Sequence, residues 1–399
     1  MRARHWLAPV VAAGILMVSA CTTQAAHLVP VHSGPVITAG PALVGHGGQG
    51  WTIQGTANSP GKNTQTQLYS VSCPTTRFCM AAGVSAKNSN GPAVVERWDH
   101  GAWTLERLTS PGNAISTGLN TMSVSCASPS DCMAVGQGGD LWEAYAWHWD
   151  GSGWSSTGIQ APGGLMAVSC PSPGECVVVG DKNASSDTIG NWFAEQWNGS
   201  GWQMLATSPD SASLGLSALS CVSANDCMAV GVAGDLGGKP LAEHWDGQTW
   251  TPSNPPMPHG LDQGDLTGVS CSSTVHCVAV GSTQGEGPSP AYAVAWDGTS
   301  WHLLPGMPDA ADSSISQVSC PQVTRCVAVG YVQTAGGNID KVAADTWNGT
   351  GWTAASLSYP DIDYTELAGV SCVAATFCET AGFYGRSNGP QLSLVEGHR

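Results

Sequence analysis

Fourteen of the fifteen cysteines form seven pairs with a single spacing, Cys-x5-Cys, and this repetition constrains the fold more than any other feature. The pairs begin about every 50 residues, because 299 residues separate the first and last pair over six intervals. A period of this length is typical of proteins built from repeated structural units, so we expect seven copies of one unit. The pairs are Cys73/Cys79, Cys126/Cys132, Cys170/Cys176, Cys221/Cys227, Cys271/Cys277, Cys320/Cys326 and Cys372/Cys378.

A second mark, Trp-[Asp/Asn]-Gly-x-x-Trp, follows the cysteine pair in five repeats. The first repeat keeps the same tryptophan spacing with a shifted glycine, in Trp98-Asp99-His100-Gly101-Ala102-Trp103. Asp-Gly and Asn-Gly between alternating segments are typical of β-hairpin turns. The five copies are Trp149/Trp154, Trp197/Trp202, Trp245/Trp250, Trp296/Trp301 and Trp347/Trp352.

Each repeat contains four short segments that alternate between apolar and polar residues or are rich in β-branched residues. Examples are residues 122–126 before a first cysteine, 132–136 after a second cysteine, and 242–245 before a first tryptophan. Four strands in about 50 residues, repeated radially, are typical of a β-propeller blade. The predicted fold is therefore all-β, a seven-bladed β-propeller of four-stranded antiparallel blades with one disulfide per blade.

The seventh repeat predicts how the ring closes. It ends at Val395-Glu396-Gly397-His398-Arg399, where the chain stops before a second tryptophan. A strand-like segment, Gly50-Trp51-Thr52-Ile53, stands before the first repeat and has no repeat of its own. We expect this N-terminal strand to complete blade 7, which would leave no exposed sheet edge at the junction.

The cysteine pairs fit structural disulfides better than metal sites. A Cys-x5-Cys pair across a hairpin can place two Cβ atoms within disulfide reach, whereas zinc sites need closer cysteines with regularly placed histidines. For the paired indoles we expect blade packing, with a ring of sugar-stacking tryptophans as the alternative. The scattered histidines His148, His244 and His276 are expected at the surface rather than as ligands.

The turn ending in Gly247-Gln248-Thr249-Trp250 or Gly298-Thr299-Ser300-Trp301 partly resembles the Asp-box of sialidase-type propellers, Ser-x-Asp-x-Gly-x-Thr-Trp. Here the Asp stands one residue before the Gly, and Trp occupies the position of the Asp-box aspartate. The resemblance therefore implies a propeller fold but implies no catalytic activity. Residues 50–399, with Val-Ser-Cys-Pro and Cys-Val-Ala-Val-Gly, also resemble uncharacterised exported repeat proteins of high-GC Gram-positive bacteria.

The N-terminus predicts export and lipid anchoring. Residues 1–20 have the form of a signal peptide, with Arg2 and Arg4 before an uncharged apolar stretch over residues 6–18. Val18-Ser19-Ala20-Cys21 resembles a bacterial lipobox, which implies that Cys21 is lipidated. We expect residues 21–48 to be a flexible tether and residues 49–399 to be the propeller, at the outer face of the bacterial cell membrane.

Composition excludes some partners. The net charge of −16 makes nucleic acid a poor partner, because affinity there depends on neutralising phosphates. The same charge disfavours electrostatic binding to anionic lipid, so the expected membrane contact is the lipid anchor alone. We expect a monomer that needs no cofactor.

Three acidic loops before blades 5, 6 and 7 are the candidate ligand site. We expect them on the face opposite the uniform cysteine turns, where loops vary and function is usually placed. Their carboxylates could hold calcium or a cationic ligand, or form a solvated rim. The candidates are Asp262, Asp265, Asp309, Asp312, Asp361, Asp363 and Glu366.

The expected function is a membrane-anchored extracellular binding module that presents these loops to an envelope polymer, a peptide or a surface protein. The alternative is an extracellular polysaccharide hydrolase or lyase that uses the acidic loops, with Asp363 and Glu366 as its carboxylate pair. We expect binding rather than catalysis, because no nucleophile or phosphate-binding motif is present in the sequence.

Overall fold

The computed structural model contains strands and turns, and no helix, among the residues that it describes. The predicted signal peptide and Cys21 lie outside the described residues, and no described helix could cross a membrane. The described residues are 29–30, 37–38, 50–56, 58, 65–86, 92–109, 121–138, 143–182, 192–207, 214–234, 238–283, 290–308, 313–333, 340–357, 364–385 and 391–398.

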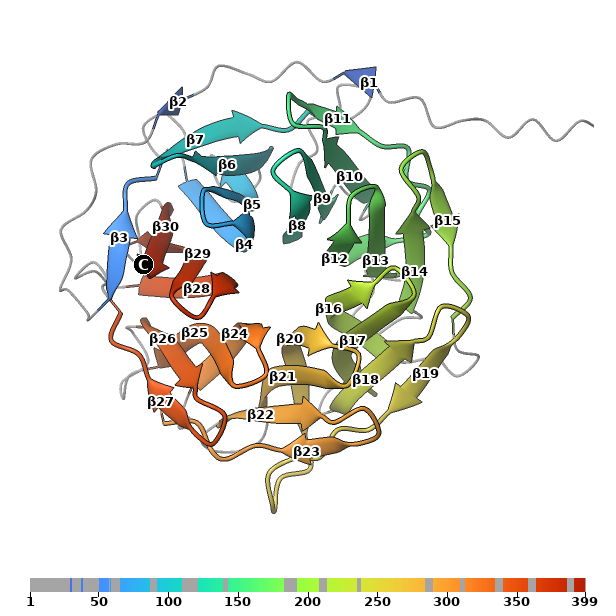
Figure 1. Cartoon of the computed structure of the whole chain (residues 1–399), viewed down its shortest axis with the longest axis vertical. Coiled ribbons are helices and arrows are strands. Elements are labelled where there is room, and N and C mark those ends of the chain that lie inside the picture. The colour runs from blue at the N-terminus through green and yellow to red at the C-terminus, as the bar shows by residue number, and fades with distance from the viewer. Residues whose placement is uncertain are drawn as a thin grey trace, which may run out of the picture.

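Seven four-stranded antiparallel blades surround a central channel, as the repeats predicted (Figure 1). The inner strands are β4 (Gln65–Thr75), β8 (Thr121–Ser128), β12 (Gly164–Ser172), β16 (Leu214–Ser223), β20 (Gly264–Ser273), β24 (Ser313–Gln322) and β28 (Tyr364–Ala374). The second strands are β5 (Phe78–Ala86), β9 (Asp131–Gly138), β13 (Glu175–Asp181), β17 (Asp226–Ala233), β21 (His276–Thr283), β25 (Arg325–Gln333) and β29 (Phe377–Gly385).

The two remaining strands of each blade lie farther from the channel. The third strands are β6 (Ala93–Asp99), β10 (Glu143–Trp149), β14 (Trp192–Trp197), β18 (Lys239–Trp245), β22 (Ala291–Trp296), β26 (Asp340–Trp347) and β30 (Gln391–His398). The outer strands are β7 (Ala102–Arg107), β11 (Trp154–Ser156), β15 (Trp202–Met204), β19 (Trp250–Ser253), β23 (Trp301–Leu303), β27 (Trp352–Ala354) and, for blade 7, β3 (Trp51–Gln54).

The N-terminal strand closes the ring as predicted. β3 pairs antiparallel with β30, with Trp51 opposite His398 and Gln54 opposite Val395. A polar chain then crosses to blade 1: Trp103 Nε1 donates to Gln54 Oε1 at 2.8 Å, and Gln54 Nε2 donates to Glu379 Oε2 at 2.7 Å. Blade 7 is therefore built from both ends of the propeller sequence.

Two short strands from the predicted tether add to the outside of the ring. β1 (Val29–Pro30) pairs with β11 of blade 2, and β2 (Ile37–Thr38) pairs with β7 of blade 1 (Figure 1). The rest of segment 21–48 lies outside the described residues. These pairings place part of that segment along the rim, where it covers two outer sheet edges.

Antiparallel pairing gives the ring two unlike faces. The short turns with the cysteine pairs and the Trp-[Asp/Asn]-Gly turns lie on one face, called here the disulfide face. The connections from second to third strands, and from each blade to the next, lie on the opposite face, called the loop face. Each strand of a blade runs opposite to the one before it, so successive turns alternate between the two ends of the blade.

A glycine near the end of the second strand recurs because the inner strand bulges toward it. A Cβ on Gly83, Gly281 or Gly382 would lie within 2.0 Å of an inner-strand carbonyl oxygen. Opposite these glycines the inner strands carry a β-bulge, at Leu68/Ser70, Leu266/Gly268 and Leu367/Gly369. The bulge turns one extra side chain, such as Tyr69 or Thr267, toward the channel.

All seven predicted disulfides form, each within one blade and with Cα atoms 4.0–4.1 Å apart. The spacing works because the first cysteine, on the inner strand, faces the second cysteine across the hairpin ladder, as Cys126 and Cys132 do. Each bond therefore fastens an inner strand to its second strand at the disulfide face.

The second cysteine of each pair lies in the second strand, as the sequence predicted, and it is buried. It stands opposite the first tryptophan of the next hairpin, as Cys79 does with Trp98. Each of these cysteines packs in a core cluster with side chains of the preceding blade. The seven, at most 4% exposed, are Cys79, Cys132, Cys176, Cys227, Cys277, Cys326 and Cys378.

Replacing one disulfide with serines, as in Cys126→Ser with Cys132→Ser, should lower the free energy of unfolding by about 2.4 kcal/mol. This is the chain-entropy effect of opening a loop of about seven residues. Urea titration of the oxidised protein measures it, with Ser130→Ala in the same turn as the control. An unchanged free energy of unfolding would contradict the prediction.

Candidate functional site

A ring of serine hydroxyls joins every blade to the next. In each repeat the serine before the first cysteine accepts a hydrogen bond from the backbone N–H of the first cysteine of the following blade, at 2.9–3.0 Å. The last of these bonds runs from Cys73 N to Ser371 Oγ and so links blade 7 to blade 1. The seven acceptors are Ser72, Ser125, Ser169, Ser220, Ser270, Ser319 and Ser371. These serines were not among the predicted site residues, although each precedes a first cysteine.

Five of the seven serines line a cavity of about 360 Å³ in the central channel, to which all seven inner strands contribute. Small residues and serines make up most of that lining. Because the same hydrogen bond recurs in every blade, the part of the channel wall around these serines has a structural role. A binding site is better sought where the seven-fold pattern is broken.

The paired indoles pack as predicted. Trp98 and Trp103 have ring centroids 5.7 Å apart, and the other hairpin pairs lie at 5.4–5.8 Å. In the turns, the Asp or Asn side chain accepts two backbone N–H bonds, as Asp150 Oδ1 does from Ser152 and Gly153. The glycine between them has a positive φ, 92° for Gly151, which explains the recurring Gly.

The candidate carboxylates are only partly covered by the structure. Asp309, Asp312, Asp361 and Asp363 lie outside the described residues. Asp262 is exposed just before β20. Asp265 and Glu366 lie at equivalent positions inside the inner strands β20 and β28, so the prediction of loop residues was wrong for these two. The strands begin earlier than expected because their ladders extend to Gly264 and Tyr364.

Asp265 is half-buried beside Tyr292. Tyr292 Oη donates to the backbone oxygen of Asp265 at 3.1 Å. Burial raises the pKa of the Asp265 carboxyl, against two backbone hydrogen bonds that lower it. Burial also raises the pKa of Tyr292, and the charge of Asp265 adds to that effect.

The clearest break in symmetry on the loop face is a group that we call the mouth cluster: Tyr69, Tyr364, Glu366 and Phe383. Tyr69 belongs to blade 1 and the other three belong to blade 7. The Phe383 ring lies 6.1 Å from that of Tyr69 and 5.6 Å from that of Tyr364. Tyr364 Oη donates to Glu366 Oε2 at 2.5 Å. Three aromatic rings in mutual contact and one carboxylate, bonded to the hydroxyl of Tyr364, therefore lie together near the start of two inner strands.

The electrostatics of the mouth cluster favour a cation. Burial raises the pKa of Tyr69 to about 12, and the negative charge of Glu366 contributes in the same direction. The field of Glu366 therefore reaches the Tyr69 hydroxyl, which donates to Gln67 Oε1 at 2.7 Å. A carboxylate in a cluster of aromatic rings is an arrangement that stabilises ammonium and guanidinium groups.

Calcium remains a prediction. Within the described ranges, no three His, Cys, Asp or Glu side chains come together as metal ligands would. Asp265 and Glu366 stand on blades 5 and 7, which are separated by blade 6. The structure thus does not bring these two candidates into one cation site.

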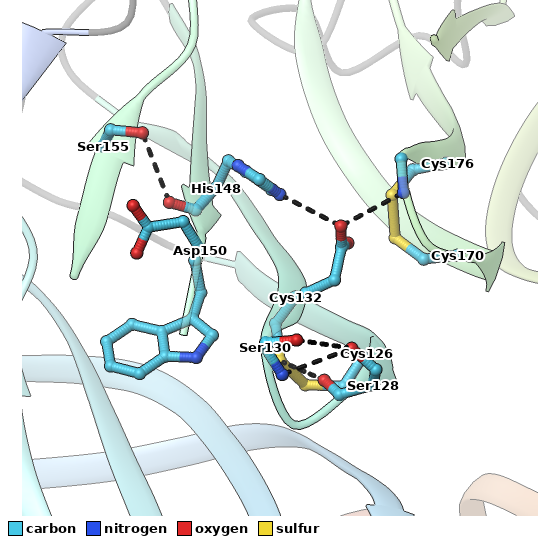
Figure 2. Close-up of polar contacts among 12 residues, drawn as sticks. Cys126, Ser128, Ser130, Cys132, His148, Asp150, Ser155, Cys170 and Cys176 are labelled. Atoms are coloured by element: carbon cyan, nitrogen blue, oxygen red, sulfur yellow. Dashed lines mark hydrogen bonds and ion pairs between the residues drawn. A yellow bond between two sulfur atoms is a disulfide. The ribbon is translucent and has the colours of Figure 1, made fainter. Parts of the chain in front are cut away.

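On the disulfide face, the residue before the first tryptophan packs against the next blade. Arg97 lies over the ring of Trp149, 5.5 Å from its centroid. The His148 ring lies 6.2 Å from that of Trp197. Its Nε2 is 3.4 Å from Asp131 Oδ2, a contact drawn as the dashed line from the ring of His148 in Figure 2.

His244 repeats this arrangement with Trp296 and Asp226, at 6.3 Å and 3.4 Å. The prediction of His148 and His244 as surface residues therefore holds only in part: their side chains are 16% and 30% exposed, because each packs against the next blade. His276 is exposed, as expected.

A buried acidic position recurs two residues before the first tryptophan, or before His398 in blade 7, and was not predicted. Glu96, Glu195, Glu243, Asp345 and Glu396 are each at most 3% exposed. Glu195 and Glu243 lie among apolar side chains, and burial raises the pKa of each carboxyl to about 7. Because these groups are sealed between blades, they affect stability rather than contact a ligand.

No model of a protein family matches the chain, and no curated protein matches it in sequence. Solved structures match in fold. YCF48 bound to D1 peptide aligns with a TM-score of 0.54 and 14% identity, covering 90% of this chain and 97% of that one. YCF48 from Cyanidioschyzon merolae gives 0.53 and 12%, covering 88% and 99%. A protein of unknown function from Dyadobacter fermentans gives 0.53 and 12%, covering 88% and 98%. At these identities the likeness shows the fold alone.

Proposed function

We propose that this protein is an exported, lipid-anchored binding module that holds an extended segment of a surface protein at the mouth cluster, through a Lys or Arg side chain. The observation that carries the proposal is Glu366 set among Tyr69, Tyr364 and Phe383 on the loop face. The aromatic faces and the carboxylate together suit a cationic side chain, and the ring holds them in place.

Two further observations support the proposal. A protein of this fold, YCF48, has been solved bound to D1 peptide, so the architecture is compatible with a peptide ligand. The lipobox-like sequence at Cys21 and the seven disulfides are consistent with an oxidising compartment outside the cell. The proposed membrane contact is the lipid on Cys21, which leaves the loop face available to a partner.

The test uses two labelled peptides, Ala-Ala-Lys-Ala-Ala and Ala-Ala-Glu-Ala-Ala, with the oxidised full-length protein in detergent. The lysine peptide should bind about tenfold more tightly, since a hydrogen bond to a charged group contributes about 1.5 kcal/mol or more. Glu366→Gln should remove most of this preference, as measured by fluorescence anisotropy at low salt.

Glu175→Gln is the matched control, because Glu175 is an exposed carboxylate on the disulfide face. This variant should bind both peptides as the unmodified protein does. Equal binding of the two peptides, or a preference that survives Glu366→Gln, would refute the role of the mouth cluster.

The polysaccharide hydrolase or lyase stays a prediction. Four of its carboxylates, among them Asp363, lie outside the described residues. Glu366 is held by the Tyr364 hydroxyl, and no second described carboxylate of the candidate set stands in the same blade. No observation on the described residues favours this alternative over peptide binding.

A further inference from the structure

The seams between blades on the disulfide face differ at one position, the residue before the first tryptophan. In blades 1, 2 and 4 this residue is Arg97, His148 or His244, and each side chain packs against the first tryptophan of the following blade. A large side chain at this position therefore fills the groove between two blades. In blade 7 the residue is Gly397, and the side chain of Gln54 occupies the space where its Cβ would lie. Where the residue is small and no other side chain takes its place, the groove stays open.

Blades 5 and 6 have small residues at this position. Ala295 leaves a pocket of about 170 Å³ between blades 5 and 6. Thr346 leaves a pocket of about 480 Å³ between blades 6 and 7, which we call the seam pocket. Two further changes enlarge it: Ala355 stands where blade 5 has Leu304, and His398 stands where the other blades have tryptophan.

The seam pocket has three aromatic rings in its wall, and its one Arg side chain makes its charge positive. Trp51, Trp347 and His398 contribute rings, and the exposed Arg325 contributes a guanidinium group. The lining contains no Asp or Glu, although the chain has 29 of them and a net charge of −16. The turn beside it has Asn348, where blades 2, 4 and 5 have Asp. The pocket is thus a cationic site on an acidic protein.

We propose that the seam pocket is a second binding site, which takes an apolar group carrying a carboxylate. The apolar group would lie between Trp51 and Trp347, and the carboxylate would pair with Arg325, whose planar group binds carboxylates in bidentate geometry. Its volume lies within the range of about 300–1,000 Å³ usual for small-ligand pockets. This chemistry occurs in small aromatic acids and at the C-terminus of a polypeptide that ends in an apolar residue.

The seam pocket is independent of the mouth cluster, because the two lie on opposite faces of the ring. It is formed partly by Trp51 of the closing strand β3 and by His398 of its partner strand β30. A ligand there would contact both strands of the closure and blade 6 at once. Binding would therefore stabilise the closed ring by mass action.

The first experiment titrates the oxidised full-length protein in detergent with 3-phenylpropionate and with its neutral analogue 3-phenylpropanamide, by calorimetry. The acid should bind at least about tenfold more tightly than the amide and raise the melting temperature. Arg325→Gln should abolish the difference between acid and amide. Arg77→Gln, in the equivalent turn of blade 1, is the matched control and should leave it unchanged.

Two filling variants test the location of the site. Thr346→His copies the residue of blades 2 and 4, and Ala355→Leu copies that of blade 5, so both introduce side chains that this fold accommodates elsewhere. Each should abolish binding of 3-phenylpropionate while the melting temperature of the protein alone stays equal or rises. Binding that survives both variants, or equal binding of acid and amide, would overturn the proposal.

A peptide pair then separates the two sources of this chemistry. Acetyl-Gly-Gly-Phe with a free C-terminus is compared with the same peptide amidated. Tighter binding of the free peptide than of 3-phenylpropionate assigns the site to a polypeptide C-terminus. Weaker binding of the free peptide assigns it to a small aromatic acid. Failure of both acids at 10 mM would overturn the site itself.

Discussion

The oxidised protein should lose stability as the pH rises from about 5 to 7.5, because Glu195 and Glu243 are protonated in the folded state. Their carboxyl pKa is raised by burial from 4.5 to about 7. The unfolded chain releases these protons above pH 4.5 and the folded chain releases them only near pH 7. The folded state binds more protons in between, so the stabilising contribution is complete below pH 4.5 and is lost as pH rises through 7.

The size of this effect is roughly 3 kcal/mol per carboxyl, the free-energy equivalent of the pKa shift. It is large because both oxygens of Glu243 and one of Glu195 lack a hydrogen-bond partner among the described residues. Chemical denaturation at pH 5, 6, 7 and 8 measures it. The double variant Glu195→Gln/Glu243→Gln should match the unmodified protein near pH 5 and exceed its stability at pH 7.5. Parallel pH profiles of the two proteins would contradict the assignment.

Deleting residues 50–54 should destabilise the propeller by roughly 5 kcal/mol or more. The deletion removes the buried side chains of Trp51 and Ile53, 3% and 8% exposed, together with the ladder to β30. It also exposes the edge of β30, which invites pairing with other chains. We expect a lower denaturation midpoint and self-association in sedimentation experiments.

The closure prediction has a control within the same strand. Thr52 is exposed between the two buried residues, so Thr52→Ala should change stability little, whereas Trp51→Ala alone should cost about 3 kcal/mol or more. A deletion variant that remains monomeric with an unchanged midpoint would mean that β3 contributes nothing to the ring.

The parts of the fold that could be predicted are those determined by contacts between residues of the same repeat. The cysteine pair and the Trp-[Asp/Asn]-Gly turn each connect adjacent strands of the same blade, so their spacing alone indicates the hairpin. Trp51 could be assigned to blade 7 because the seventh repeat has only three strands and the strand around Trp51 has no repeat of its own. The two together make one complete blade. The predicted starts of β20 and β28 came too late, so Asp265 and Glu366 were assigned to loops. A polar residue at the start of a strand has the same sequence pattern as a loop residue.

The parts that could not be predicted depend on contacts between blades. Ser72 recurs visibly beside its cysteine, but its hydrogen-bond partner is Cys126, 54 residues away. Glu243 alternates with apolar neighbours and so resembles a solvent-facing strand residue, yet the adjacent blade covers it. The seam pocket arises from Thr346 and His398 in different blades, and only the register of the ring brings them together.

The serine ring forms one hydrogen-bonded junction between each blade and the next, so the molecule has as many junctions as blades. A linear array of repeats has one junction fewer than repeats, and its terminal units can fray because each is held on one side. In this protein the two ends of the propeller sequence, β3 and β30, belong to one blade, and that blade is bonded on both sides, through Ser371 and Cys372. Detaching any single blade therefore breaks two junctions at once. Partly opened forms should be scarce, and hydrogen exchange of the inner strands should proceed through global unfolding.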